Sequence, residues 1–257
     1  MKRLRAAIRF GLVILLTAIH VLALLLASLL LFAFPRLRAR WRMFIFRSWS
    51  LGVLPVLGIE VEVEGTPPEP PFFLVTNHLS YVDIPVIGSQ VGAIFVAKAE
   101  ISSWPGVGFM CRSINTIFID RNVRRDLPRV MREIDREMAL GMGVVLFPEG
   151  TSSKGATVLP FRPSLLESAA RSDTPVSFAT LSYYTPEGEP PAHLAVCWWG
   201  GMDFSPHALQ LAQLRRVRAK LVFGDEPIHD VDRKELARRL RAVMLEQFEP
   251  VVDEDSS

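Results

Sequence analysis

The chain has 257 residues, enough for one large domain or two small ones, and 49% of them are hydrophobic, with a mean hydropathy of +0.26. Its net charge of +2 excludes the strongly basic field of a typical nucleic-acid-binding protein, so no nucleic-acid partner is expected. The only cysteines, Cys111 and Cys197, form neither a disulfide framework nor a metal-ligand spacing, which is typical of a reducing compartment. We therefore expect no metal and no other bound cofactor.

A long uncharged segment lies near the start of the chain. No charged residue occurs from Phe10 to Phe34, and a bilayer-spanning helix needs about 20 apolar residues. A signal peptide fits less well, because the apolar stretch is too long and no small-residue cleavage site follows it. Basic residues flank the segment on both sides, so the distribution of positive charge leaves its orientation open. The helix either spans the membrane or enters and leaves on one face.

The stretch that follows suits the headgroup zone of a membrane. From Arg36 to Trp49 arginines alternate with apolar residues, although on a helix these arginines would not gather on one face. Residues 1–55 are therefore predicted to anchor the protein to membrane lipids. Residues 56–250 are predicted to form one domain, and residues 251–257 an acidic tail.

Short apolar runs alternate with helical patterns in the rest of the chain. Helices are predicted at 126–141 and 231–248, where apolar residues recur at helical spacing. The runs that predict strands are 58–65, 72–76, 93–97, 116–119, 143–147, 174–184, 192–199 and 218–224. Such an alternation predicts a single α/β domain with a central, mostly parallel sheet covered by helices.

Polar clusters follow three of these predicted strands. They are Asn77-His-Leu-Ser-Tyr-Val-Asp83, Asp120-Arg121, and Pro148-Glu-Gly-Thr-Ser-Ser153. In parallel sheets, chemistry collects in the loops beyond the carboxyl ends of the strands, so the three clusters are expected at one rim.

His78 and Asp83 have the composition of a base and its orienting group. A neutral histidine accepts a proton near neutral pH, and a neighbouring carboxylate fixes its tautomer. Alone, this spacing is more typical of an ordinary loop histidine. No nucleophile elbow surrounds Ser80, so a catalytic His78 would activate a hydroxyl of the substrate rather than one of the protein.

The other two clusters suit an anion. The glycine and hydroxyl residues of 148–153 can present backbone N–H groups to a phosphate or carboxylate, although an ordinary turn has the same composition. Arg121 is a candidate anion anchor, and an ion pair with Asp120 or Glu149 is an equal alternative.

Together the three motifs, Asn77–Asp83, Phe118-Ile-Asp-Arg121 and Phe147–Ser153, resemble those of the glycerolipid acyltransferase family, which includes 1-acylglycerol-3-phosphate acyltransferases. The similarity covers roughly 58–183. It implies that His78 is the general base and that Asp83 supports it. It also implies that the acceptor headgroup is bound by residues of the two later motifs and by a lysine between the first two motifs: Lys98, Arg121, Glu149, Gly150 and Thr151.

Two positions depart from the family pattern. Ser152 stands where relatives usually carry an arginine, and Asn115 stands where a glycine usually begins the second motif. The missing arginine weakens the case for a phosphomonoester acceptor. The motif at 147–155 and the later segment 198–207 also resemble members that acylate lyso-ornithine lipids.

The resemblance implies a membrane-bound O-acyltransferase. It would move a fatty acyl group from a thioester of CoA or acyl carrier protein to the free hydroxyl of a lysophospholipid. The first candidate acceptor is 1-acyl-sn-glycerol-3-phosphate. Lyso-ornithine lipid is the alternative acceptor, and a non-catalytic lipid-binding protein is the alternative of another class. The catalytic domain is expected on the cytoplasmic side of the inner membrane, where acyl donors occur. Trp198 and Phe204 are expected to pack or to floor an acyl tunnel, and His207 is expected at the surface or in a loop.

Overall fold

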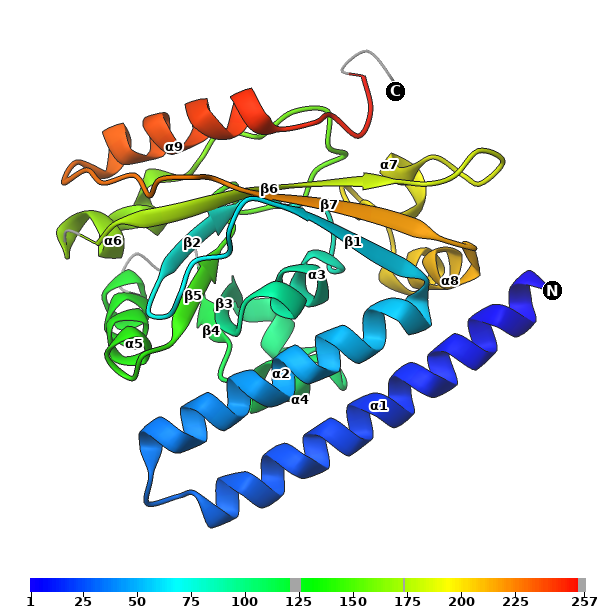
Figure 1. Cartoon of the computed structure of the whole chain (residues 1–257), viewed down its shortest axis with the longest axis horizontal. Helices are drawn as coiled ribbons and strands as arrows, with labels where there is room; N and C mark the ends of the chain where they lie inside the picture. The colour runs from blue at the N-terminus through cyan, green and yellow to red at the C-terminus, as the bar shows by residue number, and fades with distance from the viewer. Residues whose placement is uncertain (121–125, 173, 254–257) are drawn as a thin grey trace.

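A helical hairpin precedes and flanks the rest of the protein (Figure 1). The computed structural model describes residues 1–120, 126–172 and 174–253. Helix α1 (Lys2–Leu30) and helix α2 (Pro35–Leu57) run antiparallel and pack against each other. Among the described helices, α1 is the one long and apolar enough to cross a membrane, and only 11% of its most apolar stretch is buried.

Seven strands form a single sheet in the described part of the chain, in the order β1-β7-β6-β2-β5-β3-β4. Neighbouring strands are parallel except for β6 and β7, which are antiparallel. The strands are β1 (Ile59–Glu64), β2 (Phe73–Thr76), β3 (Ala93–Lys98), β4 (Ile117–Ile119), β5 (Gly143–Leu146), β6 (Val176–Tyr184) and β7 (Val217–Phe223). The predicted α/β class with a mostly parallel sheet is therefore confirmed.

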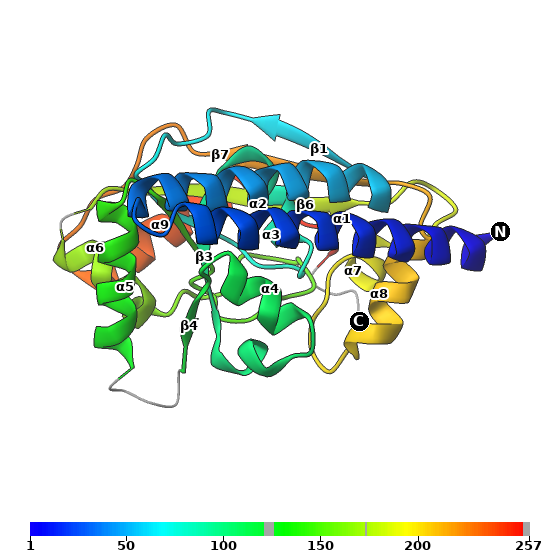
Figure 2. The same cartoon turned by 90° about the horizontal axis from the view of Figure 1, so that it is seen from below.

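Helices pack on the sheet through two apolar cores (Figures 1 and 2). The first core includes side chains of α2, α3 (Asp83–Gln90), α7 (Ala192–Ala195) and α8 (Phe204–Gln213). The second includes side chains of α5 (Leu127–Ala139), α6 (Glu167–Arg171) and α9 (Arg233–Gln247). Helix α4 (Val107–Ser113) and the short 3₁₀ helices η1 (Ala99–Ser103) and η2 (Pro163–Leu166) complete the described elements.

The hairpin is fastened to the domain by polar and apolar contacts. Near its start, Arg5 and Arg9 of α1 donate to backbone carbonyls of residues 212–215, between α8 and β7. Helix α2 packs on α3, and Phe46 lies so close to Gly88 that a Cβ there would approach its ring to 2.5 Å. Phe46 and Leu54 belong to the first core. The division of the chain at residue 55 stays a prediction.

Most predicted elements are present, and one is wrong. The run 192–199 forms the short helix α7 and then an irregular segment instead of a strand. Pro191 precedes the helix directly, and proline is compatible with a helix start because it has no N–H to lose. The apolar residues that suggested a strand are buried nonetheless, since Ala195, Val196 and Cys197 have no exposed surface. A short apolar run cannot by itself distinguish a strand from a buried irregular segment.

Candidate active site

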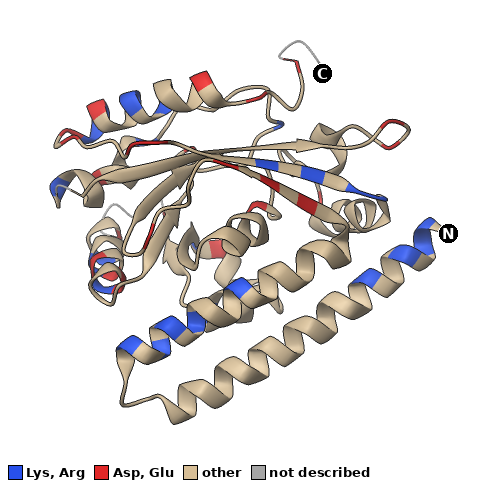
Figure 3. Ribbon diagram, viewed as in Figure 1, with Lys and Arg blue, Asp and Glu red and all other residues tan. Residues whose placement is uncertain are grey.

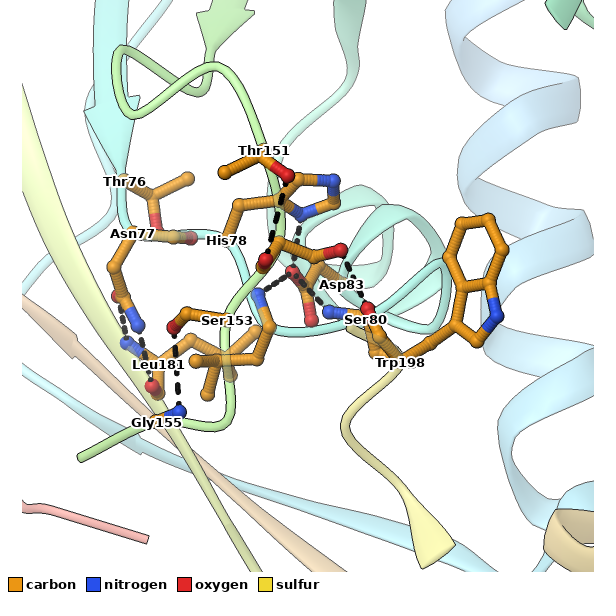
Figure 4. A network of polar contacts seen from close by, with 12 residues as sticks. Thr76, Asn77, His78, Ser80, Asp83, Thr151, Ser153, Gly155, Leu181 and Trp198 are labelled. Atoms are coloured by element: carbon orange, nitrogen blue, oxygen red, sulfur yellow. Dashed lines mark hydrogen bonds and ion pairs between the residues drawn. The ribbon is translucent and has the colours of Figure 1, made fainter. Parts of the chain in front are cut away.

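The loop after β2 is held in place by Asn77. Its side-chain carbonyl accepts from the backbone N–H of Leu181 at 2.7 Å, and its amide donates to the Leu181 carbonyl at 2.9 Å (Figure 4). Asn77 is fully buried, and its amide thus pairs with β6 as the backbone of a further strand residue would. This contact fixes the point at which the chain leaves the sheet, directly before His78.

His78 and Asp83 are in direct contact, as their spacing predicted. The ring Nδ1 of His78 lies 2.7 Å from Oδ2 of Asp83. A carboxylate only accepts hydrogen bonds, so Nδ1 carries the proton and Nε2 keeps a free lone pair. The ring nitrogen not bonded to Asp83 points away from it (Figure 4), and the His78 side chain retains 23% exposure. His78 therefore has the tautomer that a general base needs.

Asp83, the first residue of α3, is completely buried. Its Oδ2 also accepts from the backbone N–H groups of Leu79 at 2.7 Å and Ser80 at 3.0 Å. Its Oδ1 accepts from the hydroxyl of Tyr183 at 2.8 Å. These are neutral donors, and no lysine or arginine pairs with Asp83 among the described residues. Hydrogen bonds to the charged form are what stabilise a carboxylate at such a position.

Phe147 supports the His78 ring from the neighbouring strand. The two ring centroids are 4.1 Å apart with an interplanar angle of 24°, so the rings stack. Phe147 directly follows β5, which pairs with β2 in parallel. The expectation that polar clusters from neighbouring parallel strands meet at one rim holds for the first and third motifs.

The loop 147–153 packs against the loop of His78. The Gly150 N–H donates to the Phe147 carbonyl at 3.1 Å, and Gly150 has φ +75°, a conformation that favours glycine. The Ser153 N–H donates to the His78 carbonyl at 3.0 Å. Ser152, which stands in place of the family's arginine, donates its hydroxyl to the Trp198 carbonyl. The backbone N–H of Trp198 donates to the Leu79 carbonyl at 2.8 Å, so three segments are tied together.

Glu149 lies beneath this loop rather than at its surface. Its residue exposure is 3%, and neither carboxyl oxygen has a partner at hydrogen-bonding distance and angle among the described residues. Burial raises the pKa of Glu149 well above 4.5, and the charge of Asp83 acts in the same direction. The backbone N–H groups of Leu159 and His78 lie near enough to oppose this rise in part.

An apolar cavity of about 440 Å³ opens beside His78. The hairpin forms one wall, with Val21 and Leu24 of α1 and Phe46 of α2, and the loops at the rim of the sheet form the other. Most of the lining residues are apolar or aromatic. The volume falls in the range of about 300–1,000 Å³ that small-molecule pockets occupy.

The remaining predicted site residues are dispersed around this cavity. Lys98, at the end of β3, and Gly150 and Thr151 line it. Glu149 is not among the lining residues. Arg121 lies outside the described residues. Asn115 has φ +64°, which explains how it can replace a glycine, and its amide donates to Glu137 at 2.8 Å.

The aromatic residues after α7 line the cavity, as the tunnel alternative supposed. Trp198 and Phe204 both face it, and Tyr81 packs edge-on against each of them. The expectation that His207 lies at the surface or in a loop is wrong, because this residue lies in α8 and is 5% exposed. Its Nδ1 lies 3.1 Å from the Tyr81 hydroxyl, and its Nε2 lies 3.0 Å from the Cys197 carbonyl.

The sequence offered no signal for Tyr183 as part of the site. It is the second-last residue of β6, 100 residues from Asp83, and only the pairing of β6 with β2 brings it there. No group of three metal-binding side chains occurs among residues 1–120, 126–172 and 174–253.

The site thus combines a histidine held by a buried carboxylate with an apolar cavity at the rim of an α/β sheet. Residues 58–181 match the Acyltransferase family model. A lyso-ornithine lipid O-acyltransferase of Rhizobium meliloti is 32% identical over 77% of this chain and 72% of its own. The chain belongs to this acyltransferase family, and the predicted enzyme class is confirmed.

One further relative and one solved structure extend the comparison. A 1-acyl-sn-glycerol-3-phosphate acyltransferase of Neisseria meningitidis serogroup B is 36% identical over 58% of this chain, and the match spans 62% of that protein. The crystal structure of the 1-acyl-sn-glycerophosphate acyltransferase PlsC from Thermotoga maritima superposes with a TM-score of 0.67 and covers 96% of this chain and 97% of that one. At 21% identity, this likeness concerns the fold.

Proposed function

We propose that the protein is a membrane-bound O-acyltransferase that transfers a fatty acyl group from a thioester, on CoA or acyl carrier protein, to the free hydroxyl of a lysolipid. One observation carries the proposal. His78 is held by Asp83 at 2.7 Å in the tautomer of a general base, and its ring lines an apolar cavity that suits a hydrocarbon chain.

The reaction uses His78 twice. Its Nε2 removes the proton of the lysolipid hydroxyl while the oxygen attacks the thioester carbonyl carbon. When the tetrahedral intermediate collapses, the carbon–sulfur bond breaks and the leaving thiolate takes the proton from the imidazolium. Asp83 keeps the ring in place and compensates its charge during the reaction. Positioning of the two substrates and base catalysis together supply the acceleration.

The acceptor headgroup is proposed to lie at the open side of the cavity. Lys98, Gly150 and Thr151 line the cavity, with Lys98 and Thr151 exposed, and Arg121 belongs to the same predicted set. Glu149 is proposed to affect headgroup binding through the loop that lies above it, because its carboxyl is buried. The first candidate acceptor is 1-acyl-sn-glycerol-3-phosphate, with phosphatidic acid as the product. The relative from Neisseria meningitidis and the fold neighbour from Thermotoga maritima, which carry this activity in their names, support it.

Lyso-ornithine lipid is the second candidate acceptor, and Ser152 favours it. The Ser152 hydroxyl donates to the Trp198 carbonyl, and this side chain places no positive charge beside the cavity. A phosphomonoester acceptor gains most from a cationic anchor at this position, whereas a zwitterionic amino-acid headgroup depends on it less. A relative from Rhizobium meliloti that is named for this activity matches a longer part of the chain than the relative from Neisseria does.

Attachment to the membrane is proposed to use the outer face of the hairpin without crossing the bilayer. Both ends of the hairpin are tied to the domain, by Arg5 and Arg9 at the start of α1 and by the entry into β1 at the end of α2. The uncharged length of α1 carries many exposed leucines, while blue arginines lie at its start and along the first half of α2 (Figure 3). Apolar side chains would enter the lipid and arginines would meet its headgroups on the cytoplasmic side.

The test is acyl transfer by the purified protein in detergent, with H78A as the control. CoA and acyl-carrier-protein thioesters are offered against lysophosphatidic acid and lyso-ornithine lipid in parallel. Transfer to lysophosphatidic acid, lost in H78A, supports the first acceptor. Transfer to lyso-ornithine lipid alone supports the second. A folded protein that transfers to neither, but binds lysolipids, would be the non-catalytic lipid-binding protein.

A further inference from the structure

Asp83 has two carboxyl oxygens, and they serve different partners. Oδ2 faces His78 and the backbone N–H groups of Leu79 and Ser80, all within the same loop. Oδ1 faces the opposite way and accepts from Tyr183, which belongs to β6. The loop alone therefore fixes one oxygen, and a residue 100 positions away fixes the other.

Tyr183 is one of the largest fully buried side chains of the described protein, with 1% exposure. Burial raises the pKa of its hydroxyl well above 10, and the negative charge of Asp83 raises it further. The hydroxyl thus stays protonated across the working pH range and acts only as a donor toward the carboxylate. Filling the core would require only its ring, because a phenylalanine would bury the same apolar surface without a polar atom to satisfy.

We propose that Tyr183 is a positioning residue of the catalytic pair: its hydroxyl holds Oδ1 of Asp83 so that Oδ2 stays aligned with Nδ1 of His78. This inference rests on the proposed acyltransferase function. Two anchor points on opposite oxygens prevent rotation of the carboxylate about its Cβ–Cγ bond. The hydrogen bond from Tyr183 also draws negative charge toward Oδ1 and so moderates how strongly Asp83 stabilises the protonated ring.

The pairing of β6 with β2 holds the Tyr183 hydroxyl at Asp83. Strand β6 pairs with β2, with Thr76 opposite Ala179, and β2 delivers His78 two residues later. Asn77 is bonded to Leu181 of the same strand. Strand β6 thus positions both the start of the His78 loop, through Asn77, and the carboxylate at its end, through Tyr183.

The chain offers a matched control in the next residue of the same strand. Tyr184 also donates its hydroxyl to a carboxylate, that of Glu249, but this pair is exposed and neither residue lines the cavity. Y183F and Y184F remove the same atom from the same strand, each from a tyrosine–carboxylate pair. Only Y183F removes it from Asp83.

Steady-state acyl transfer is the first measurement. Y183F is expected to lower kcat roughly tenfold, with KM for donor and acceptor changed less than about twofold, since misalignment affects the transition state more than binding. The acid limb of the pH–rate profile is expected to move to higher pH, because a more concentrated charge on Asp83 holds the proton on His78 more firmly. Y184F should match the wild type in both. A purely structural role for Tyr183 would lower the amount of folded enzyme without moving the pH limb.

A double-mutant cycle and a substrate-free measurement complete the test. In a D83A background, Y183F should have no further effect on kcat, because the group through which it acts is gone. The downfield NMR resonance of the His78 Nδ1 proton should shift or broaden in Y183F and not in Y184F. If wild type transfers acyl groups and Y183F keeps the wild-type kcat, pH limb and resonance, the inference is wrong. If wild type transfers none, the proposed function fails, and the resonance still decides whether Tyr183 positions the pair.

Discussion

Replacing Glu149 with glutamine should make the free energy of unfolding fall less steeply with pH above about pH 5. The carboxyl is buried, and neither of its oxygens has a hydrogen-bond partner among the described residues. Burial, reinforced by Asp83, raises the pKa of Glu149 well above 4.5 in the folded protein. In the unfolded chain the group titrates near its ordinary value of about 4.3.

The sign of the pH dependence follows from the proton count. Between the unfolded and the folded pKa of Glu149, the folded state binds one proton more than the unfolded state. The free energy of unfolding therefore falls as pH rises through this window, by at most about 1.4 kcal/mol per pH unit from this group. Glutamine resembles the protonated acid and has no charge to lose. The free energy of unfolding of E149Q minus that of wild type should therefore increase with pH, by up to the same slope.

The assay is thermal or chemical unfolding in detergent between pH 4.5 and pH 8, for wild type, E149Q and E187Q. Glu187 is exposed in the loop after β6 and serves as a matched control with the same change of atoms. A glutamine amide that lacks partners can lower stability by about 1–3 kcal/mol at every pH, so the slope is the informative quantity. A difference between E149Q and wild type that stays constant from pH 4.5 to pH 8 would refute the reasoning. A large increase in KM for the acceptor in E149Q would instead support direct headgroup binding by Glu149.

Three other changes test the remaining parts of the structure. H78A should lower kcat by about 10²–10⁴-fold in acyl-transfer assays while its melting temperature stays near that of wild type, and activity at the wild-type rate would remove His78 from the mechanism. G88A should lower the free energy of unfolding by about 1–3 kcal/mol, because the added Cβ meets the Phe46 ring at 2.5 Å, with G11A as a control position that has open space. V21W should shorten the longest acyl chain accepted from a series of CoA thioesters, because Val21 lines the cavity, whereas L22W on the exposed side of α1 should not.

Much of the architecture could be predicted because it depends on local patterns. Period-two alternation marked β1, short apolar runs marked β2 to β5, and helical spacing marked α5 and α9. The run 192–199, which contains α7, was mistaken for a strand. Burial on all sides removes the periodicity that distinguishes a helix from a strand. The arginine-rich stretch 36–49 was difficult for a related reason. It is helical, but α2 packs against α1 and α3 together, so its buried residues do not form a simple stripe.

The candidate site divides in the same way. The contact of His78 with Asp83 lies within one short loop, and the sequence by itself predicted it once the three motifs were taken together, as it predicted the apolar α1 and a glycine-containing turn at 150. Only the tertiary structure decided that Tyr183 holds the other oxygen of Asp83, that Glu149 is buried and that α1 forms a wall of the cavity. The physical reason is range: a hydrogen bond within one loop follows from spacing along the chain, whereas these contacts depend on the order of strands in the sheet and on how the hairpin docks.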